Sequence, residues 1–407
     1  MSDGVDAAAW LEKIAGCSEP GPGVTRLPWT EPHAAALRQI AGWMQAAGLE
    51  VSRDAAGTLI GRTPGRAEAP ALLLGSHQDS VREGGRFDGI MGVALACLAV
   101  RRLHDEGVAL PFALEVLAFA DEEGVRFPTA LIGPRALAGR FDPEVLEMRD
   151  TDGVSMAEAM RAFGAVPEEI AGLARDPAQV VGYLEAHIEQ GPVLESADAP
   201  VGVVTAICGI ARYGLRFSGE TGHAGTVPMG ERRDALVAAG RFVADVSEAA
   251  EGFAESRATV GQLSVAPGVV NAIPSEVTLT LELRAPEDAT RDALEARARA
   301  LAEAAAAACG VTVEMTRTYD QPAVACDPGL RAALGDGMAA AGLGALELPS
   351  GATHDASAMA DLCPVGMLFL RCAGGVSHRP DEFAAPEDMA QAVAVLAEAV
   401  KAVAARG

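Results

Sequence analysis

The residues best suited to chemistry in this chain are histidines and carboxylates that stand where predicted strands end. Imidazole and carboxylate groups together suit zinc, manganese, cobalt or nickel, and such a site needs no thiolate ligand. Ligand sites in open α/β sheets gather at the carboxyl edge of the strands. We therefore expect one shared metal site from five residues: His77, Asp88, Glu123, His187 and His378.

Two of these residues have a structural alternative. His77 lies in the segment GSHQD, where Asp79 could hold the ring nitrogen that faces away from a metal, although a surface-loop histidine beside an aspartate is the simpler interpretation. Asp88 precedes a predicted helix and could serve as its N-cap. A carboxylate at the same place could instead bridge two cations, and the glycines around it would let the backbone pass close to such a site.

Asp121, Glu122 and Glu123 form an acidic run at the end of a buried strand. Adjacent acids repel one another unless cations or shared protons offset the repulsion. A dinuclear site would use one glutamate as a ligand and its neighbour as a general base, whereas the alternative is a solvated acidic turn. His187 and Glu189 share one face of their strand, since side chains alternate along a strand.

The elements that must position these residues alternate between strands and helices. Apolar runs at 71–75 and 112–120 predict strands buried on both faces, with a helix over 89–103 between them. Further strands are expected at 183–190 and 201–207. After residue 321 the same pattern returns, with a helix near 328–341, a strand at 366–371 and a last helix from 386. This pattern predicts an α/β sandwich around a central mixed sheet.

The middle of the chain has a different pattern. Strands are expected at 211–219, 259–266, 276–284 and 311–317, with helices at 233–250 and 286–309. This βαββαβ order is typical of a self-contained α+β sandwich. We therefore predict a catalytic domain in two parts, 1–208 and 321–407, interrupted by an inserted domain at 209–320.

Composition limits the classes of partner. The chain has 407 residues and a net charge of −24, which repels phosphate backbones and anionic lipids. No apolar stretch approaches the roughly 20 residues of a membrane span, and the N-terminus carries acids where a signal peptide is basic. The seven cysteines form no CxxC pair, which indicates reduced thiols. We expect a cytoplasmic protein that binds neither nucleic acid nor membranes.

Several segments together resemble the amidase, hydantoinase/carbamoylase family, a branch of the dinuclear metallopeptidases related to aminoacylase and carboxypeptidase G. They occur in family order between residues 75 and 382: GSHQDSVREGGRFDG, DEEGVRF, HIEQGPVLE, GHAGTVPM, NAIPSEV, SGATHDA and GVSHRPDE. HIEQGPVLE and GGRFDG favour this branch over the dipeptidases. The resemblance covers most of the chain.

The resemblance implies two divalent metal ions per subunit (Zn, Mn, Co or Ni). One would be held by His77, Asp88 and His187, and the other by Asp88, Glu123 and His378, with Asp88 bridging. Glu122 falls on the general base of the family. At or near substrate-binding positions fall Gln190, Arg212, His223, Asn271, Arg284 and the turn of Ser350, Gly351 and Ala352. The inserted domain would be a lid and the interface of a homodimer, and its His223 would reach the partner's active site.

The residues alone leave three of these positions open. Asn271 could simply make an Asx turn, Arg284 an ordinary surface ion pair, and His223 a solvated loop residue. With the resemblance, Arg284 is expected to clamp a carboxylate, since a guanidinium binds a carboxylate in a bidentate manner. Asn271 would add a polar contact, and His223 would stabilise an oxyanion.

The predicted reaction is hydrolysis of a ureido (carbamoyl) C–N bond in a small carboxylate substrate, which releases ammonia and carbon dioxide. The wording of SHQDSV resembles allantoate amidohydrolases, so allantoate is the predicted substrate. The alternative is an N-carbamoyl-L-amino acid hydrolase of L-carbamoylase or β-ureidopropionase type. More distant alternatives are a metallo-dipeptidase and a non-catalytic, metal-stabilised binding protein.

Overall fold

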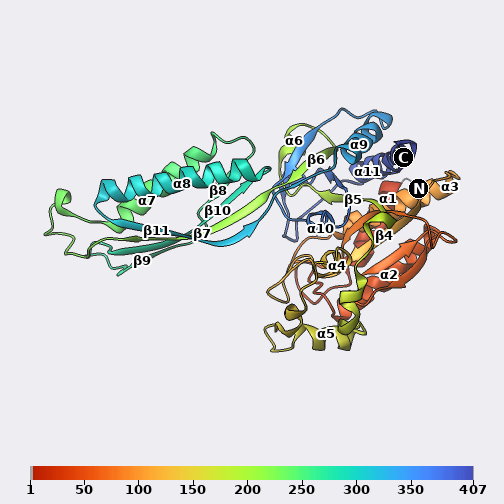
Figure 1. The fold of residues 1–407 in the computed structure, drawn as a ribbon, viewed down its shortest axis with the longest axis horizontal. Coiled ribbons are helices and arrows are strands. Elements are labelled where there is room, and N and C mark those ends of the chain that lie inside the picture. Colours follow the sequence, from red (N-terminus) through yellow and green to blue (C-terminus); the bar gives the residue numbers. More distant parts are fainter. Residues whose placement is uncertain (1–2, 407) are drawn as a thin grey trace. The chain divides into compact units, whose positions relative to one another are not determined.

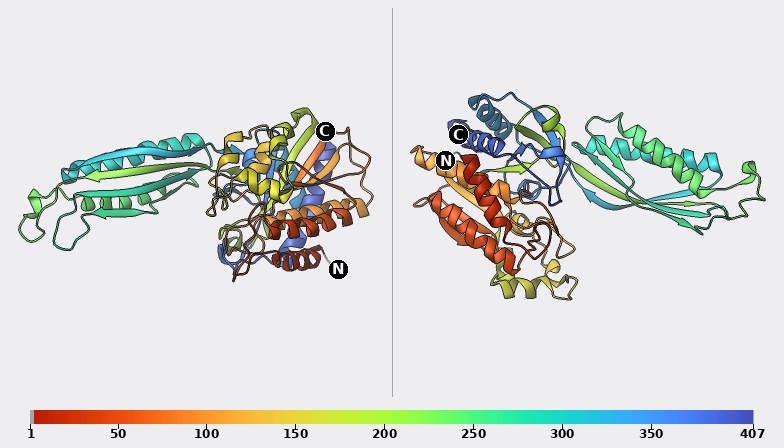
Figure 2. Two further views of the ribbon diagram at one scale, coloured as in Figure 1. Left: turned by 90° about the horizontal axis from the view of Figure 1, so that it is seen from below. Right: turned by 180° about the vertical axis from the view of Figure 1, so that it is seen from behind.

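The computed structural model describes residues 3–406, and the chain divides into two compact units (Figure 1). The first unit comprises the chain up to Thr205 together with Cys326–Leu348 and the chain from Thr353 onward. The second comprises Ala206–Ala325 and Pro349–Ala352. Both units contain a sheet with helices packed on it, as the two further views also show (Figure 2).

The first unit is built on a mixed sheet in which the strands follow the order β1-β2-β4-β3-β5-β14-β6. The bounds are β1 (Glu50–Arg53), β2 (Leu59–Arg62), β3 (Ala71–His77), β4 (Ala113–Phe119), β5 (Val180–Ile188), β6 (Val201–Ile207) and β14 (Val365–Leu370). Strands β4, β3, β5 and β14 run parallel, while β1, β2 and β6 run antiparallel to their neighbours. The short strands β12 (Val324–Ala325) and β13 (Glu347–Ser350) also pair with β6. The predicted α/β class with a mixed sheet is confirmed.

Helices bury the central strands. Every residue of β3 and β4 is buried, as expected of parallel strands covered on both faces. One core joins the sheet to α1 (Asp3–Ala15), α2 (Glu31–Ala46), α3 (Ile90–Asp105), α9 (Pro328–Ala340) and α11 (Pro386–Arg406). A second core involves α4 (Ile132–Leu137) and α5 (Met156–Phe163), and α10 (Asp355–Met359) packs on β5 and β14. Within residues 3–406, no helix is long and apolar enough to cross a membrane.

Two element ends differ from the sequence prediction in ways that affect the site. The strand expected at 71–75 continues to His77, so this histidine ends a strand instead of lying on a surface loop. The strand expected at 183–190 ends at Ile188. Gln190 has a φ of 58°, a left-handed conformation that cannot continue a strand.

The second unit is an antiparallel sheet covered on one side by two helices. Its strands follow the order β11-β7-β10-β8, with β9 also paired to β10. The bounds are β7 (Gly209–Ser218), α7 (Ala235–Ala250), β8 (Arg257–Thr259), β9 (Leu263–Ala266), β10 (Glu276–Ala285), α8 (Asp288–Cys309) and β11 (Thr312–Gln321). Side chains of β10 alternate between buried and more exposed, because only one face packs against α7 and α8.

The single strand predicted at 259–266 is wrong, because the structure divides it into β8 and β9. Both strands pair with β10, but the ladder is interrupted between them. There the backbone N–H of Gln262 donates to Thr280 Oγ1 at 3.2 Å, so a side chain replaces a ladder partner. The observed order is therefore βαβββαβ.

Candidate metal centre

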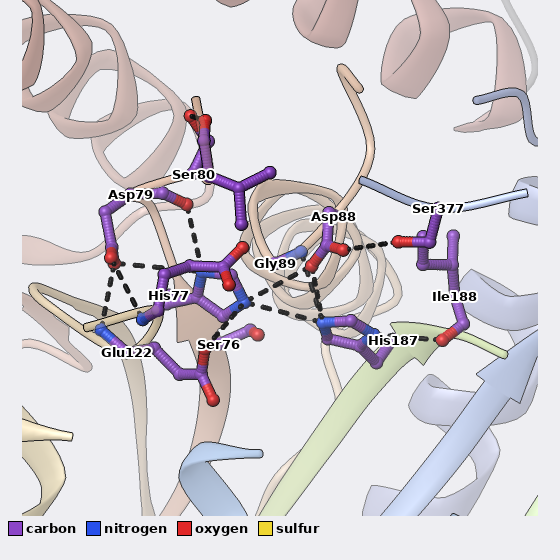
Figure 3. Close-up of polar contacts among 12 residues, drawn as sticks. Ser76, His77, Asp79, Ser80, Asp88, Gly89, Glu122, His187, Ile188 and Ser377 are labelled. Atoms are coloured by element: carbon purple, nitrogen blue, oxygen red, sulfur yellow. Dashed lines mark hydrogen bonds and ion pairs between the residues drawn. The ribbon is translucent and has the colours of Figure 1, made fainter. Parts of the chain in front are cut away.

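The carboxyl ends of the parallel strands bring the predicted metal ligands together in the first unit. Figure 3 shows three of them, His77, Asp88 and His187. His77 is the last residue of β3, and His187 lies near the end of β5. Glu123 follows β4, and His378 follows β14. Asp88 comes from the loop that precedes α3. Side chains from five segments between residues 77 and 378 thus meet at one edge of the sheet.

Asp88 lies at the centre of this cluster and is 6% exposed. Its Oδ1 lies 3.1 Å from His187 Nε2 and 3.5 Å from His77 Nε2. Its Oδ2 faces the other side, 3.3 Å from His378 Nε2. The N-cap of α3 is Gly89, with no side-chain cap, so the alternative role of Asp88 as a helix cap is wrong. A carboxylate with its two oxygens turned to different histidines is placed to bridge two cations.

Three groups among the described residues bring their potential ligand atoms within 4.8 Å of one another. Two are the sets expected from the resemblance, and the third contains His77, Glu122 and Glu123. Glu123 Oε1 is buried and has no hydrogen-bond partner within residues 3–406, as expected of an oxygen kept for a ligand. The donors are imidazole nitrogens and carboxylate oxygens, which fit zinc, manganese, cobalt or nickel.

The two buried histidines are held in one tautomer by backbone carbonyls. His77 Nδ1 lies 3.0 Å from the carbonyl oxygen of Asp79, and His187 Nδ1 lies 2.9 Å from that of Ile188. A carbonyl oxygen only accepts hydrogen bonds, so each Nδ1 carries the proton and donates it. Nε2 of each ring then faces the cluster with its lone pair, as metal ligation requires.

The Asp79 carboxylate was expected to hold the His77 ring, but it accepts hydrogen bonds from the backbone of the acidic run instead. Its Oδ1 lies 3.7 Å from His77 Nδ1, beyond hydrogen-bond length. The backbone N–H groups of Glu122 and Glu123 donate to Oδ1 and Oδ2 of Asp79, each at 3.2 Å. Asp79 therefore fixes the turn that presents both glutamates.

The electrostatics of the cluster favour positive charge. Burial, together with the charges of Asp355, Asp79 and Asp88, raises the pKa of Glu122 well above its ordinary value. Burial alone would lower the pKa of His77, but the nearby carboxylates of Asp88 and Glu122 raise that pKa well above the ordinary value. Buried carboxylates that raise a histidine pKa in this way would equally stabilise a bound metal cation.

Gln190 and Ser377 complete this side of the cluster. Gln190 Nε2 donates to Asp88 Oδ2 at 2.8 Å, and Ser377 Oγ donates to the same oxygen at 2.7 Å. Gln190 was expected near the substrate, and the structure places it beside the candidate ligands. Ser377 was not predicted from the sequence, although it directly precedes the predicted ligand His378 in GVSHRPDE.

Position 89 needs a glycine for two reasons: the His77 ring lies too close for a side chain, and the backbone has a positive φ. Its φ is 64°, and a Cβ at this position would lie 2.3 Å from His77 Cε1. The N–H of Gly89 also lies 3.3 Å from His187 Nε2. The glycine thus lets the Asp88 loop reach the two histidines, which supports the role expected for glycines in this segment.

Arg284 and the Gly351 turn lie together in the second unit. Arg284 donates from Nη1 to the carbonyl oxygen of Gly351 and from Nε to Glu282 Oε1, the latter at 2.7 Å. Arg212 donates from Nε to Glu282 Oε2, also at 2.7 Å, and stacks over Tyr319. The backbone N–H of Ala352 donates to Ser350 Oγ, which closes the turn. The surface ion pair that was the structural alternative for Arg284 therefore exists, and its carboxylate, Glu282, is shared with Arg212.

His223 and Asn271 form a second pair at the opposite end of the same sheet. Both are exposed, and the N–H of Ala224 donates to the carbonyl oxygen of Asn271 at 2.9 Å. They flank the end of β7 and the start of β10, whereas Arg284 lies near the end of β10. Ten strand residues span about 30 Å. One chain therefore does not bring His223 and Asn271 to Arg284.

Comparisons with known proteins all point to one family of hydrolases. Residues 73–402 match the model of peptidase family M20/M25/M40. An N-carbamoyl-L-amino acid amidohydrolase of Geobacillus stearothermophilus is 41% identical over 379 residues, 93% of each chain. Allantoate deiminase of Arabidopsis thaliana is 36% identical over 95% of this chain and 80% of its own. The crystal structure of a hydantoinase/carbamoylase family amidase from Burkholderia multivorans gives a TM-score of 0.92, with 34% identity over 99% of this chain and 98% of that chain.

Proposed function

Because this chain belongs to peptidase family M20/M25/M40 and its relatives are C–N hydrolases, we propose that it hydrolyses the carbamoyl C–N bond of a small ureido acid. The observation that carries the proposal is Asp88, with its two oxygens turned to different histidines and Glu122 close by. Two divalent cations held by these residues would polarise the carbamoyl oxygen and acidify the attacking water. The remaining steps depend on the chain's own side chains.

Glu122 is the proposed general base. Its Oε2 lies 3.9 Å from His77 Nε2, and the residue is 9% exposed, so it stands beside the ligands and largely out of bulk water. Glu122 would take a proton from water as the water oxygen bonds to the carbamoyl carbon. It would then deliver that proton to the leaving nitrogen as the C–N bond breaks. The carbamic acid so released decomposes to ammonia and carbon dioxide, which balances the reaction.

Arg284 is the proposed carboxylate clamp, and Gln190 and Arg212 are proposed to contribute to the substrate site. Glu282 fixes Nε of Arg284, and the Gly351 carbonyl fixes Nη1, so the guanidinium is oriented before substrate binds. A planar guanidinium held in this way is suited to bidentate carboxylate binding. Such a clamp would fix the orientation of the bound substrate through its carboxylate.

We further propose that the active protein is a homodimer formed through the second unit. His223 and Asn271 lie about 30 Å along the sheet from Arg284, too far to reach a substrate that Arg284 holds in the same chain. His223 of the partner subunit would supply a hydrogen bond to the developing oxyanion, a contact worth about 3 kcal/mol. Asn271 of the partner subunit, adjacent to it, would add a polar contact to the substrate.

The preferred substrate class is the N-carbamoyl-L-amino acids, because the relative named for them is 41% identical. Allantoate, predicted from the sequence, is the second candidate, because allantoate deiminase is 36% identical over 95% of this chain. Both substrates combine a carboxylate with a carbamoyl group, so both satisfy the same proposed contacts.

The test is ammonia release by purified protein reconstituted with Mn²⁺ or Zn²⁺. N-carbamoyl-L-methionine, N-carbamoyl-β-alanine, allantoate and a dipeptide would be offered separately. We expect turnover of one or more ureido acids and none of the dipeptide. Absence of turnover with every ureido acid, by protein that retains metal, would overturn the proposed reaction and favour a binding protein.

A further inference from the structure

The segment 377–382 carries two functional side chains, since His378 is a candidate metal ligand and Glu382 is a buried carboxylate. Glu382 is only 2% exposed. Its Oε1 accepts hydrogen bonds from the backbone N–H groups of Phe87 and Asp88, at 2.9 and 3.0 Å. One carboxylate oxygen has lone pairs for both donors. Glu382 therefore fixes the backbone of the very residue whose side chain faces both histidine groups.

Two further contacts show that the approach of Glu382 to this loop is specific. A Cβ at Gly85 would lie 2.2 Å from Glu382 Oε1, so any side chain at position 85 would displace the carboxylate. Next to it, the rings of Phe87 and Phe383 meet edge to face, with centroids 5.9 Å apart. Segment 85–88 and segment 382–383 thus fit together through backbone, glycine and aromatic contacts.

We propose that Glu382 is a positioning residue for the metal centre, an inference that rests on the proposed function. By accepting the two amides, it fixes the main chain of Asp88 relative to the segment that carries His378. Because Glu382 joins the two segments, it helps to maintain the distance of 3.3 Å between Asp88 Oδ2 and His378 Nε2. Glu382 acts through hydrogen-bond acceptance, and its negative charge is not required. Its effect is on metal affinity, before any substrate binds.

Variants of Glu382 can separate its role as a hydrogen-bond acceptor from the effect of its negative charge. Glu382→Ala removes the acceptor, and Glu382→Asp keeps the charge on a side chain too short to reach both amides. Glu382→Gln keeps an Oε1 acceptor without the charge. Asp381→Ala is the matched control, because this neighbouring carboxylate is exposed and pairs only with Arg379 among the contacts of the described residues.

The first measurement is a titration of substrate-free protein with Mn²⁺, in which the EPR signal of free Mn²⁺ reports how much metal remains unbound. We expect the Ala and Asp variants to bind Mn²⁺ about 10–100-fold more weakly, and the Gln variant and the control to stay within about threefold of wild type. Hydrogen exchange of peptides containing residues 87 and 88 is the second readout. Exchange should become faster in the Ala and Asp variants and return to the wild-type rate in the Gln variant.

The proposal is overturned if folded Glu382→Ala or Glu382→Asp binds Mn²⁺ as tightly as wild type, or if Glu382→Gln binds as weakly as Glu382→Ala. Should the Ala variant fail to fold, the Asp and Gln variants still decide the matter. Wild-type protein that binds Mn²⁺ but hydrolyses no ureido acid would overturn the proposed reaction alone. The role of Glu382 would then stand on the titration and exchange data.

Discussion

Glu122 and Glu123 are adjacent glutamates with different proposed roles, and their geometry explains why. Glu123 Oε2 lies 3.8 Å from His378 Nε2, on the side of Asp88 Oδ2, whereas Glu122 lies near His77. Asp79 holds the backbone amides of both residues. The turn therefore places the Glu123 carboxylate beside one set of candidate metal ligands. It leaves the Glu122 carboxylate beside His77, where the attacking water is proposed to bind.

We predict that Glu122→Gln lowers the turnover of ureido acids by about 10²–10⁴-fold, because the amide cannot take a proton. Metal content, measured by mass spectrometry of the dialysed protein, should equal that of wild type, since Glu122 belongs to neither of the two expected ligand sets. The exposed Glu169→Gln is the control. Substantial residual activity with metal present would show that another group acts as base.

His33 shows the opposite electrostatic effect, because it is buried without a carboxylate partner among residues 3–406. Burial, with smaller effects from Arg26 and Arg53, lowers its pKa from 6.5 to about 3. Its Nδ1 accepts a hydrogen bond from the backbone N–H of Trp29 at 2.9 Å. The native ring is therefore neutral, while the unfolded ring takes up a proton below pH 6.5.

Because the unfolded state binds this proton and the native state does not, stability is lost as pH falls from about 6.5 towards 3. His33→Asn keeps an acceptor for Trp29 but cannot titrate. Between pH 6 and pH 4, the free energy of unfolding of wild type should fall by about 1.4 kcal/mol per pH unit more than that of the variant. Urea unfolding at several pH values measures the difference, and parallel pH profiles would contradict this explanation.

At the scale of elements, a buried arginine joins the end of α1 to the segment that follows β3. Arg26 is 1% exposed and donates to the carbonyl oxygens of Gln78, Ile14 and Cys17, at 2.6, 3.2 and 3.1 Å. Burial lowers its pKa to about 10, which still leaves it charged at neutral pH. Gln78 directly follows the candidate ligand His77, so the hydrogen bond from Arg26 to the Gln78 carbonyl helps to hold the backbone next to that ligand.

Arg26→Met should therefore be severely destabilising, because three carbonyl groups lose their charged donor. We expect a loss of about 3 kcal/mol or more in the free energy of unfolding, measured by urea denaturation. Arg38→Met is the comparison, since Arg38 makes an exposed ion pair with Glu31 and should change stability by about 0.5 kcal/mol. Equal stability of the two variants would show that the Arg26 contacts contribute little.

The sequence predicted those elements whose signal is local. The apolar runs of β3 and β4 and the residue types of His77, Asp88, Glu123, His187 and His378 sufficed to predict a ligand cluster at one sheet edge. Features that depend on distant partners could not be read in the same way. The division into β8 and β9 depends on pairing with β10, and the role of Asp79 depends on amides more than 40 residues away. Glu382 is a similar case, since its partners are two backbone N–H groups that carry no sequence signal.

At the scale of the whole molecule, the net charge of −24 describes the chain and not the candidate centre. Bound cations would offset the buried carboxylates around Asp88, and Arg284 adds a positive charge in the second unit. An anionic substrate is therefore compatible with a strongly acidic protein.

Removal of metal should lower stability as well as activity, because the buried carboxylates would lose their counter-charge. Thermal unfolding with EDTA and with re-added Mn²⁺ measures this effect.

The proposed homodimer makes a prediction that a single-chain site does not. Glu122→Gln and His223→Ala chains should each be nearly inactive alone. In a mixed dimer, the site with intact Glu122 would receive His223 of the partner subunit and would work. Random association of equal amounts should restore about a quarter of the wild-type sites, because half of the dimers are mixed and each has one complete site. Co-expression followed by an ammonia assay tests this, and no recovery would mean that His223 acts within its own chain or not at all.

If the homodimer forms as proposed, the separation of His223 from Arg284 along β10 also affects how activity responds to dilution. If a complete site needs both ends of the sheet from different chains, then a single chain has no complete site. Below the dissociation constant of the dimer, the concentration of dimers falls with the square of the chain concentration. Activity per milligram would then decline in proportion to dilution, and protein concentration itself would regulate the rate.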